Sequence, residues 1–204
     1  MKPKFTKFNF PKFYPVLPDV NWIERLAPHG IKVVQLRLKD AEPAEIERQI
    51  LASLEITKRY NIQLIVNDYW QAAIRLGADY IHLGQEDLEA ADLKEIKANN
   101  IKLGVSTHSL EELDIALKAE PDYIALGPVY ETILKKMKWA PQGLDNVRLW
   151  RTKTELPLIA IGGITPKRAP LVLDAGADSV AVVTDLVTAE DPEVQTQLWV
   201  EQIS

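Results

Sequence analysis

The chain has 204 residues, with 24 basic and 29 acidic side chains, a formal net charge of −5 and no cysteine. This length suits one domain with a substantial hydrophobic core, so no disulfide or metal is needed to hold the fold together. The acidic balance argues against a general nucleic-acid-binding protein, and no apolar run approaches the ~20 residues of a membrane span. The absence of cysteine excludes disulfide bonds and thiolate chemistry, and it fits a cytoplasmic location.

The N-terminal residues predict a basic arm in front of the folded domain. The first 12 residues contain four lysines and no acidic residue, and lysine or proline interrupts every apolar run. A signal peptide needs a continuous apolar stretch, so we expect an extended arm over residues 1–12 and one domain over residues 13–204. The alternative is that the arm attracts anions over a binding site or contacts a second copy of the chain.

From residue 13 onward, short apolar segments alternate with longer amphipathic ones. The short segments are rich in Val, Ile and Leu and are bounded by Gly, Pro, Asn or Asp, as β-strands are. In chain order they are residues 13–18, 32–38, 63–68, 80–84, 102–107, 123–129, 156–163 and 179–186.

Helical periodicity fills the intervals between these strands. Three of the helical segments are residues 44–60, 109–120 and 166–176. Asp19 is placed to start the first helix, and Thr165 with Pro166 to start the seventh. Glycines that are placed to stop a helix are Gly30, Gly77 and Gly176.

Eight strand–helix pairs in this order predict an α/β fold with parallel strands. Such units close into a (β/α)8 TIM barrel, and a single compact domain accounts for the whole pattern. The alternative is a doubly wound open sheet. In a barrel, functional residues collect at the carboxyl ends of the strands and in the loops that follow, so polar residues at these positions are the candidates for the site.

Cationic and amide side chains end the second predicted strand. Alternation places Gln35, Arg37 and Lys39 on one face, and Leu36 and Leu38 on the other. A solvated edge strand would explain the polar face, but a parallel strand in a barrel is covered on both sides. The polar side chains therefore predict an anion site.

Acidic side chains follow the next two predicted strands. Asn67 and Asp68 end the third strand, and Asp87 follows the fourth. One or two carboxylates beside a cationic strand are typical of Mg²⁺ that is shared with substrate phosphate, whereas a zinc site needs softer ligands. The alternative is that each aspartate caps a helix.

Two further polar residues lie on predicted inner strands. Ser106, near the end of the fifth strand, is a candidate ligand hydroxyl, and it has no adjacent general base that would make it a nucleophile. His82 lies within the fourth strand. We expect it to be a hydrogen-bonded structural residue rather than a catalytic base.

The connection after the sixth strand runs over residues 127–143 without a clear strand or long helix. A loop of this length in a compact barrel is typical of a functional lid. It contains Thr132 and a cluster of lysines that includes Lys135. The cluster is suited to clamp phosphate, and a solvated surface is the alternative.

The last two strands end in segments that suit a phosphate group. Gly162 and Gly163 allow close approach of the backbone, and Val183 and Thr184 follow at the end of the eighth strand. Backbone amides after strands seven and eight form the usual phosphate-binding site of this fold.

Taken in order, these motifs resemble those of the thiamine-phosphate synthase (thiamine phosphate pyrophosphorylase) family. They are QLRLK (35–39), VNDYW (66–70), HLGQEDL (82–88), LGVSTH (103–108), DYIALGPVYET (122–132), APQGL (140–144), IAIGGI (159–164) and AGADSVAVVT (175–184). The resemblance implies a (β/α)8 barrel and a Mg²⁺-dependent transferase. Such an enzyme joins an aminopyrimidine methyl diphosphate to a thiazole phosphate, and it releases pyrophosphate together with CO₂ when the thiazole is carboxylated.

The resemblance also implies roles at the pyrimidine half of the site. Gln35, Arg37 and Lys39 would grip the diphosphate region of the pyrimidine substrate, Asn67 would contact the same substrate, and Ser106 would contact its pyrimidine ring. Asp68 and Asp87 would hold Mg²⁺ on the pyrophosphate group. Lys135 would contact the diphosphate as it leaves, and with Arg37 and Lys39 it would neutralise the developing negative charge.

At the thiazole half, the sequence departs from the family pattern. The residues that would hold the thiazole phosphate are Thr132, Leu134, Gly163, Val183 and Thr184. The family's sixth loop usually reads Pro-Thr-x-Thr-Lys, whereas here Glu131 replaces the proline and Leu134 the second threonine. Losing one hydroxyl donor to a charged group costs roughly 1.5–3 kcal/mol.

Two other functions fit parts of this pattern. The first is a related thiazole tautomerase, an isomerase on the same scaffold. An isomerase does not need to bind a diphosphate, so the QLRLK segment, the two aspartates and Lys135 argue against it. A degenerate barrel that binds a thiamine precursor without catalysis would explain Glu131 and Leu134. We expect phosphorylated pyrimidine and thiazole molecules as partners, with no nucleic acid and no membrane. A homo-oligomer is compatible with the sequence, which carries no signal for it.

Overall fold

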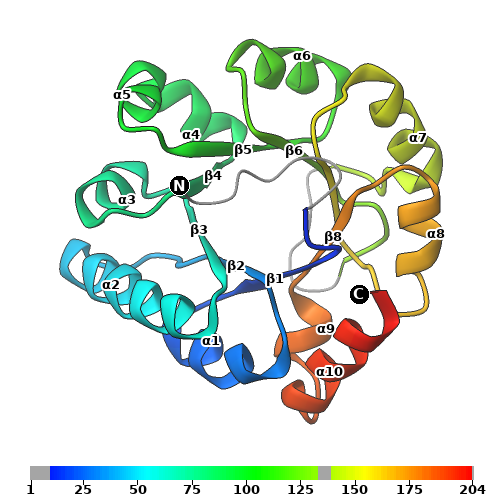
Figure 1. The fold of residues 1–204 in the computed structure, drawn as a ribbon. Helices are drawn as coiled ribbons and strands as arrows, with labels where there is room; N and C mark the ends of the chain where they lie inside the picture. Colours follow the sequence, from blue (N-terminus) through cyan, green and yellow to red (C-terminus); the bar gives the residue numbers. More distant parts are fainter. Residues whose placement is uncertain (1–9, 133–138, 204) are drawn as a thin grey trace.

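Alternating strands and helices close into a barrel in the computed structural model, which describes residues 10–132 and 139–203. The strands pair in chain order, each parallel to the next, and β8 pairs with β1 (Figure 1). They are β1 (Phe13–Leu17), β2 (Val33–Leu36), β3 (Gln63–Asn67), β4 (Tyr80–Leu83), β5 (Lys102–Thr107), β6 (Tyr123–Leu126), β7 (Leu158–Ile161) and β8 (Ser179–Val182). The predicted (β/α)8 barrel is confirmed, and the β1–β8 pairing rules out the open sheet.

The helices form a ring outside the strands (Figure 1). In chain order they are α1 (Val20–Leu26), the 3-10 turn η1 (Ala27–His29), α2 (Pro43–Tyr60), α3 (Trp70–Leu76), α4 (Gln85–Ala90), α5 (Leu93–Ala98), α6 (Leu110–Lys118), α7 (Gly143–Lys153), α8 (Ala169–Asp174), α9 (Thr184–Val187) and α10 (Pro192–Ile203). No helix among the described residues has the length and apolar character that a membrane span requires.

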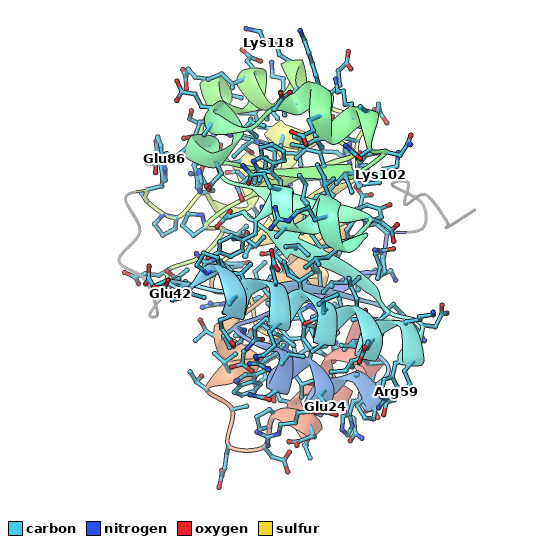
Figure 2. The ribbon with its side chains drawn as sticks, turned by 90° about the vertical axis from the view of Figure 1, so that its left-hand side faces the viewer. Glu24, Glu42, Arg59, Glu86, Lys102 and Lys118 are labelled. Atoms are coloured by element: carbon cyan, nitrogen blue, oxygen red, sulfur yellow. The ribbon has the colours of Figure 1, made fainter. Side chains whose placement is uncertain are left out.

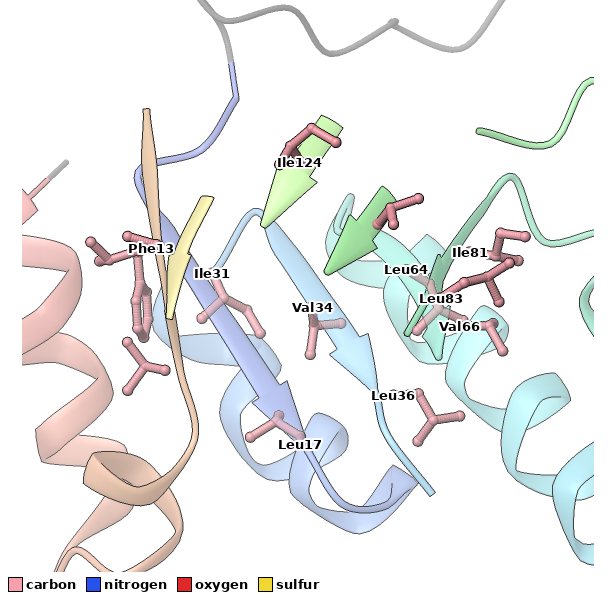
Figure 3. Close-up of a cluster of buried hydrophobic side chains, with 14 of the residues drawn as sticks. Phe13, Leu17, Ile31, Val34, Leu36, Leu64, Val66, Ile81, Leu83 and Ile124 are labelled. Carbon is pink, nitrogen blue, oxygen red and sulfur yellow. The ribbon is translucent and has the colours of Figure 1, made fainter. Parts of the chain in front are cut away.

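Strand alternation divides the buried side chains into two layers. The larger cluster lies between the strands and the helices, and Figure 3 shows Leu17, Val34 and Leu36 among its members. The smaller cluster fills the barrel interior and includes Tyr14 and Tyr123. Because successive strand residues point to opposite faces, leucine on the outer face of β2 places its neighbouring polar residues on the inner face.

The ends of the elements follow local capping chemistry. The predicted helix start at Asp19 is confirmed, since its carboxylate accepts hydrogen bonds from the backbone N–H of Asn21 at 2.8 Å and of Trp22 at 3.2 Å. The start predicted at Thr165 and Pro166 is wrong. The Thr165 carbonyl accepts from later N–H groups in a turn, and α8 begins only at Ala169.

Residues next to β1 close the end of the barrel at which the strands begin. Only residues 10–12 of the expected basic arm are described. The Phe10 ring is buried, with its centroid 5.9 Å from that of Tyr14 and 5.3 Å from that of Tyr123. The Lys12 carbonyl accepts a 2.8 Å hydrogen bond from the Val180 N–H. Phe10 therefore belongs to the interior core.

Candidate active site

The candidate site lies at the mouth, which is the end of the barrel where the strands end. In the side view of Figure 2, Glu42 and Glu86 mark this end, opposite Arg59 and Lys102. The polar residues of the QLRLK segment become more exposed along the chain: Gln35 is buried, Arg37 is half-buried and Lys39 is exposed. Between them Leu36 and Leu38 are buried in the outer cluster. The predicted alternation of this segment is confirmed.

The structure brings Asp68 and Asp87 together, although they follow different strands. Burial, the negative charge of Asp87 and a hydrogen bond between the carboxyl groups raise the pKa of Asp68 to about 6, against the opposing effects of Arg37 and Asn67. The Asn67 amide donates to the Asp68 carboxylate at 2.5 Å. The two acids and Arg37 thus form one electrostatic unit, which links β2, β3 and the start of α4.

Neither aspartate is the N-cap of a helix. Tyr69 occupies the N-cap position of α3, without a side-chain capping bond, and Gly84 occupies that of α4. Asp68 has the left-handed φ of 65°, which turns the chain sharply between β3 and α3. The helix-cap interpretation of these residues is therefore wrong, and the carboxylates are left for another role at the mouth.

This pair fits a hard divalent cation. Burial is the largest cause of the raised Asp68 pKa, and the negative charge of Asp87 adds to it; a nearby cation would offset the contribution of Asp87. Within the described residues no three His, Cys, Asp or Glu side chains converge as metal ligands. The protein would thus supply two carboxylates, and water and a bound diphosphate would complete the shell, which is the usual arrangement for Mg²⁺.

Removing the Asp68 charge is expected to stabilise the metal-free protein at alkaline pH. The folded-state pKa of about 6 lies above the ordinary 3.8, so the unfolded chain ionises this carboxyl first as the pH rises. The stability that the protonated form contributes is therefore complete below pH 3.8 and is lost as the pH rises through about 6. Urea unfolding in EDTA should show Asp68→Asn more stable than the parent at about pH 8, with the gap closing toward about pH 4.

The control for this measurement is Asp114→Asn, which removes an exposed acid from α6. It changes the net charge by the same amount at a site outside the mouth, and it should not reproduce the gap that Asp68→Asn opens at about pH 8. A gap between Asp68→Asn and the parent that stays constant across this pH range would contradict the assigned cause.

Gln35 and Ser106 lie in the barrel interior immediately below the mouth. The Gln35 amide nitrogen donates to the Tyr14 hydroxyl at 2.8 Å, and the Ser106 hydroxyl is 2.7 Å from Nε2 of His82. The other ring nitrogen of His82 is 2.8 Å from the Tyr123 hydroxyl. His82 is therefore a hydrogen-bonded buried residue, as predicted. Neither tyrosine is among the site residues predicted from the sequence, although each occupies an inward position of its strand.

The turn after β7 lies close to the start of the sixth loop. Gly163 has a φ of 62°, and a Cβ at this position would come within 2.4 Å of the Glu131 carbonyl oxygen. Arg168, which sequence analysis did not single out, donates to the Gly163 carbonyl at 2.6 Å. Its guanidinium lies 4.5 Å from the centre of the Tyr130 ring. These contacts hold the backbone of Gly163 beside the start of the sixth loop.

The other residues predicted for the thiazole phosphate are placed in part. Val183 and Thr184 follow β8 and are half-buried, with Thr184 the first residue of α9. Thr132 is half-buried in the sixth loop. Leu134 and Lys135 lie outside the described residues, so their predicted roles stay predictions.

The fold and the site together define a class of protein, a (β/α)8-barrel enzyme. Its mouth combines cationic side chains, a carboxylate pair and a glycine turn. The family model described as thiamine monophosphate synthase matches residues 14–186.

Individual relatives agree with this match. A thiamine-phosphate synthase of Rhizobium etli is 53% identical over 188 residues, which cover 92% of each chain. One of Salmonella typhimurium is 48% identical over 179 residues, covering 87% of this chain and 85% of its own. A solved thiamine phosphate pyrophosphorylase from Pyrococcus furiosus superposes with a TM-score of 0.83 at 29% identity, covering 94% of this chain and 95% of its own. The chain belongs to the thiamine monophosphate synthase family and is an enzyme of the transferase class.

Proposed function

We propose that this protein couples an aminopyrimidine methyl diphosphate to a thiazole phosphate in the presence of Mg²⁺, giving thiamine phosphate and pyrophosphate. A carboxylated thiazole phosphate would also release CO₂. The observation that carries the proposal is the 53% identity to the Rhizobium etli synthase across 92% of both chains. The juxtaposition of Asp68, Asp87 and Arg37 at the mouth supports it, because this is the charge arrangement that a metal-bound diphosphate needs.

The proposed reaction requires stabilisation of negative charge on the leaving group and alignment of the two substrates. The candidate side chains are cationic and hydrogen-bonding groups that can supply both. Loss of pyrophosphate leaves a cation that the electron-rich aminopyrimidine ring stabilises, and the thiazole nitrogen then bonds to the methylene carbon. Arg37 and Lys39 would neutralise charge on the departing pyrophosphate, and Lys135 would contact it from the sixth loop. Mg²⁺, when bound between Asp68 and Asp87, would add further neutralising charge to the same oxygens.

At the other end of the site, the chain would position the second substrate. The backbone beside Gly163 and the start of α9 at Thr184 would hold the thiazole phosphate. Ser106 would hold the pyrimidine ring deeper in the mouth, and Gln35 would contact the same substrate from β2. With both substrates fixed, the two reacting atoms meet in a single orientation, which replaces a bimolecular encounter by a local one.

The test supplies both phosphorylated precursors and Mg²⁺ to the folded protein and follows pyrophosphate release, with thiamine phosphate identified by mass. Formation of thiamine phosphate that requires both precursors would support the proposal. Pyrophosphate release without thiamine phosphate would indicate a hydrolase, and isomerisation of the thiazole without the pyrimidine would indicate a tautomerase. Either result, or no reaction from folded protein, would contradict it.

Leu134→Thr is expected to lower the KM for the thiazole phosphate by about tenfold, because it restores the hydroxyl donor that the family pattern has at this position. The KM for the pyrimidine diphosphate should not change. Leu134→Val is the matched control, since valine has the shape of threonine without its hydroxyl. Equal KM values for the two variants would show that the hydroxyl makes no contact with the phosphate.

A further inference from the structure

Five polar side chains from five different strands form a continuous series of hydrogen bonds through the barrel interior, which we call the hydrogen-bond chain. The amide nitrogen of Gln35 donates to the Tyr14 hydroxyl at 2.8 Å, and the hydroxyls of Tyr14 and Tyr123 are 3.0 Å apart. The Tyr123 hydroxyl is 2.8 Å from Nδ1 of His82, and Nε2 of His82 is 2.7 Å from the Ser106 hydroxyl. This hydrogen-bond chain therefore starts at Gln35 and ends at Ser106, two residues that are proposed to contact the pyrimidine substrate.

The barrel interior is built around this chain. Tyr14, Tyr123 and His82 are 1%, 0% and 6% exposed, so their polar atoms depend on each other for hydrogen bonds. Gly104 of β5 makes room for the Tyr123 ring, because a Cβ on Gly104 would lie 1.9 Å from the ring carbon Cζ. The Phe10 ring packs against both tyrosines.

Each member of the chain has a defined protonation state at neutral pH. Burial raises the pKa of both Tyr14 and Tyr123 above the ordinary phenol value, so both hydroxyls keep their protons. Burial, together with the positive charge of Arg37, lowers the pKa of His82 to about 3. The imidazole is therefore neutral, with one ring nitrogen that donates and one that accepts.

The amide of Gln35 determines which group donates and which accepts in each bond of the hydrogen-bond chain. An amide nitrogen can only donate, so the Tyr14 oxygen accepts and its own proton is directed to Tyr123. Tyr123 then donates to Nδ1 of His82, which must carry its single proton on Nε2. Nε2–H donates to the Ser106 oxygen. The hydroxyl proton of Ser106 is left for a group bound in the mouth.

We propose that Tyr14, Tyr123 and His82 are positioning residues that fix Ser106 as a hydrogen-bond donor to a ring nitrogen of the pyrimidine substrate. This inference rests on the proposed function, since it names the pyrimidine as the acceptor. A site of this kind selects a ring nitrogen with a free lone pair. It discriminates against an oxo-pyrimidine that carries N–H at the same position, because two donors would then face each other in a buried place.

The direction of the chain is tested first without substrate. ¹⁵N-histidine labelling of the whole protein reports the tautomer of each imidazole ring. The protein has three histidines, so the double variant His29→Gln with His108→Gln gives a spectrum in which His82 is the single labelled histidine. We expect a neutral His82 with its proton on Nε2 at neutral pH. A proton on Nδ1, an even mixture of the two tautomers, or a charged ring would overturn the inference.

The second arm tests whether the chain acts on the substrate through Ser106. Tyr123→Phe should raise the KM for the pyrimidine diphosphate about tenfold, while kcat and the KM for the thiazole phosphate change less than about twofold. In a Ser106→Ala background, Tyr123→Phe should raise this KM no further. An equal rise in both backgrounds, or no rise in either, would overturn the positioning role.

A matched control separates positioning from loss of stability. Thr107 lies next to Ser106 on β5 but is part of an outward-facing contact, where it accepts from the Trp150 indole at 2.9 Å and donates to the Ala125 carbonyl at 2.9 Å. Thr107→Val should lower the unfolding free energy and leave the His82 tautomer and the KM unchanged. A Thr107→Val variant that raises the KM as much as Tyr123→Phe would assign the effect to stability and overturn the inference.

The two arms also separate this inference from the proposed function. If the parent protein makes no thiamine phosphate, the proposed function fails, whereas the tautomer of His82 still decides the direction of the chain. If Tyr123→Phe does not fold, Tyr14→Phe is used instead, because it interrupts the hydrogen-bond chain between Gln35 and Tyr123. The KM for the pyrimidine diphosphate is then compared with and without Ser106→Ala in the same way.

Discussion

Replacing Asp68 and Asp87 together with asparagine is expected to lower Mg²⁺-dependent turnover by about 10²–10³-fold or more. The Asp87 carboxylate lies close enough to raise the pKa of Asp68, in addition to the larger effect of burial, and no third acidic or histidine ligand joins the two among the described residues. Their removal leaves a cation without a protein ligand here. The proposed reaction then loses charge neutralisation at the leaving pyrophosphate while the fold keeps its packing.

The measurement is a Mg²⁺ titration of initial rates for the parent, each single variant and the double variant. Asp114→Asn with Asp174→Asn is the matched control, because it removes two exposed acids from α6 and α8 and changes the net charge equally. Circular dichroism and urea unfolding confirm that each protein is folded. A double variant whose rate follows Mg²⁺ as the parent's does would refute the metal assignment.

Gly104→Ala is expected to be strongly destabilising, although it adds only a methyl group. The new Cβ would lie 1.9 Å from Cζ and 2.4 Å from the hydroxyl of Tyr123, and the closed barrel leaves that ring little space in which to move. Overpacking of this kind costs about 1–3 kcal/mol, and the upper end of that range is expected here because the clash involves a buried aromatic ring. Displacing Tyr123 would also break its contacts with Tyr14 and His82.

Urea unfolding of Gly104→Ala and of a Gly77→Ala control measures this cost. Gly77 has a φ of 76°, and a methyl group added there would have no neighbouring atom within 4 Å, so its substitution reports backbone strain without overlap. Adding Tyr123→Leu to Gly104→Ala removes the overlapping ring atoms and should recover part of the lost stability but none of the substrate affinity. A fully stable Gly104→Ala protein would contradict the tight fit of Tyr123 in the interior.

The barrel itself was predictable because its signals are local and repeat. Each strand is a short apolar run and each helix has its own period, so chain order alone indicates parallel strands that close into a barrel. The start of α8 was predicted wrongly, because Thr165 and Pro166 make a turn that precedes the helix rather than its first residues. Local signals of this kind cannot distinguish a turn from a first helical turn.

The site was only partly predictable, because proximity across the barrel leaves no local trace. The positions of Gln35 and Arg37 at the mouth followed from strand alternation. By contrast, Tyr14 and Tyr123 are separated by 109 positions in the chain, and each one alone resembles an ordinary core aromatic. Likewise His82 was expected to be buried, but its partners become visible only when β4, β5 and β6 lie next to one another.

The closure between β1 and β8 has a consequence for how the chain reaches its folded state. Phe13 pairs with Val180 in the sheet, and its ring stacks on that of Trp199 at 5.4 Å. One edge of β1 pairs with β2, but its other edge stays uncovered until β8, the last strand to be synthesised, is in place. Such long-range pairing slows folding, and an uncovered strand edge favours association with other chains. A growing chain that stops before β8 would consequently have an uncovered edge on β1 as well as on its last completed strand, so we expect it to depend on chaperone protection until synthesis is nearly complete.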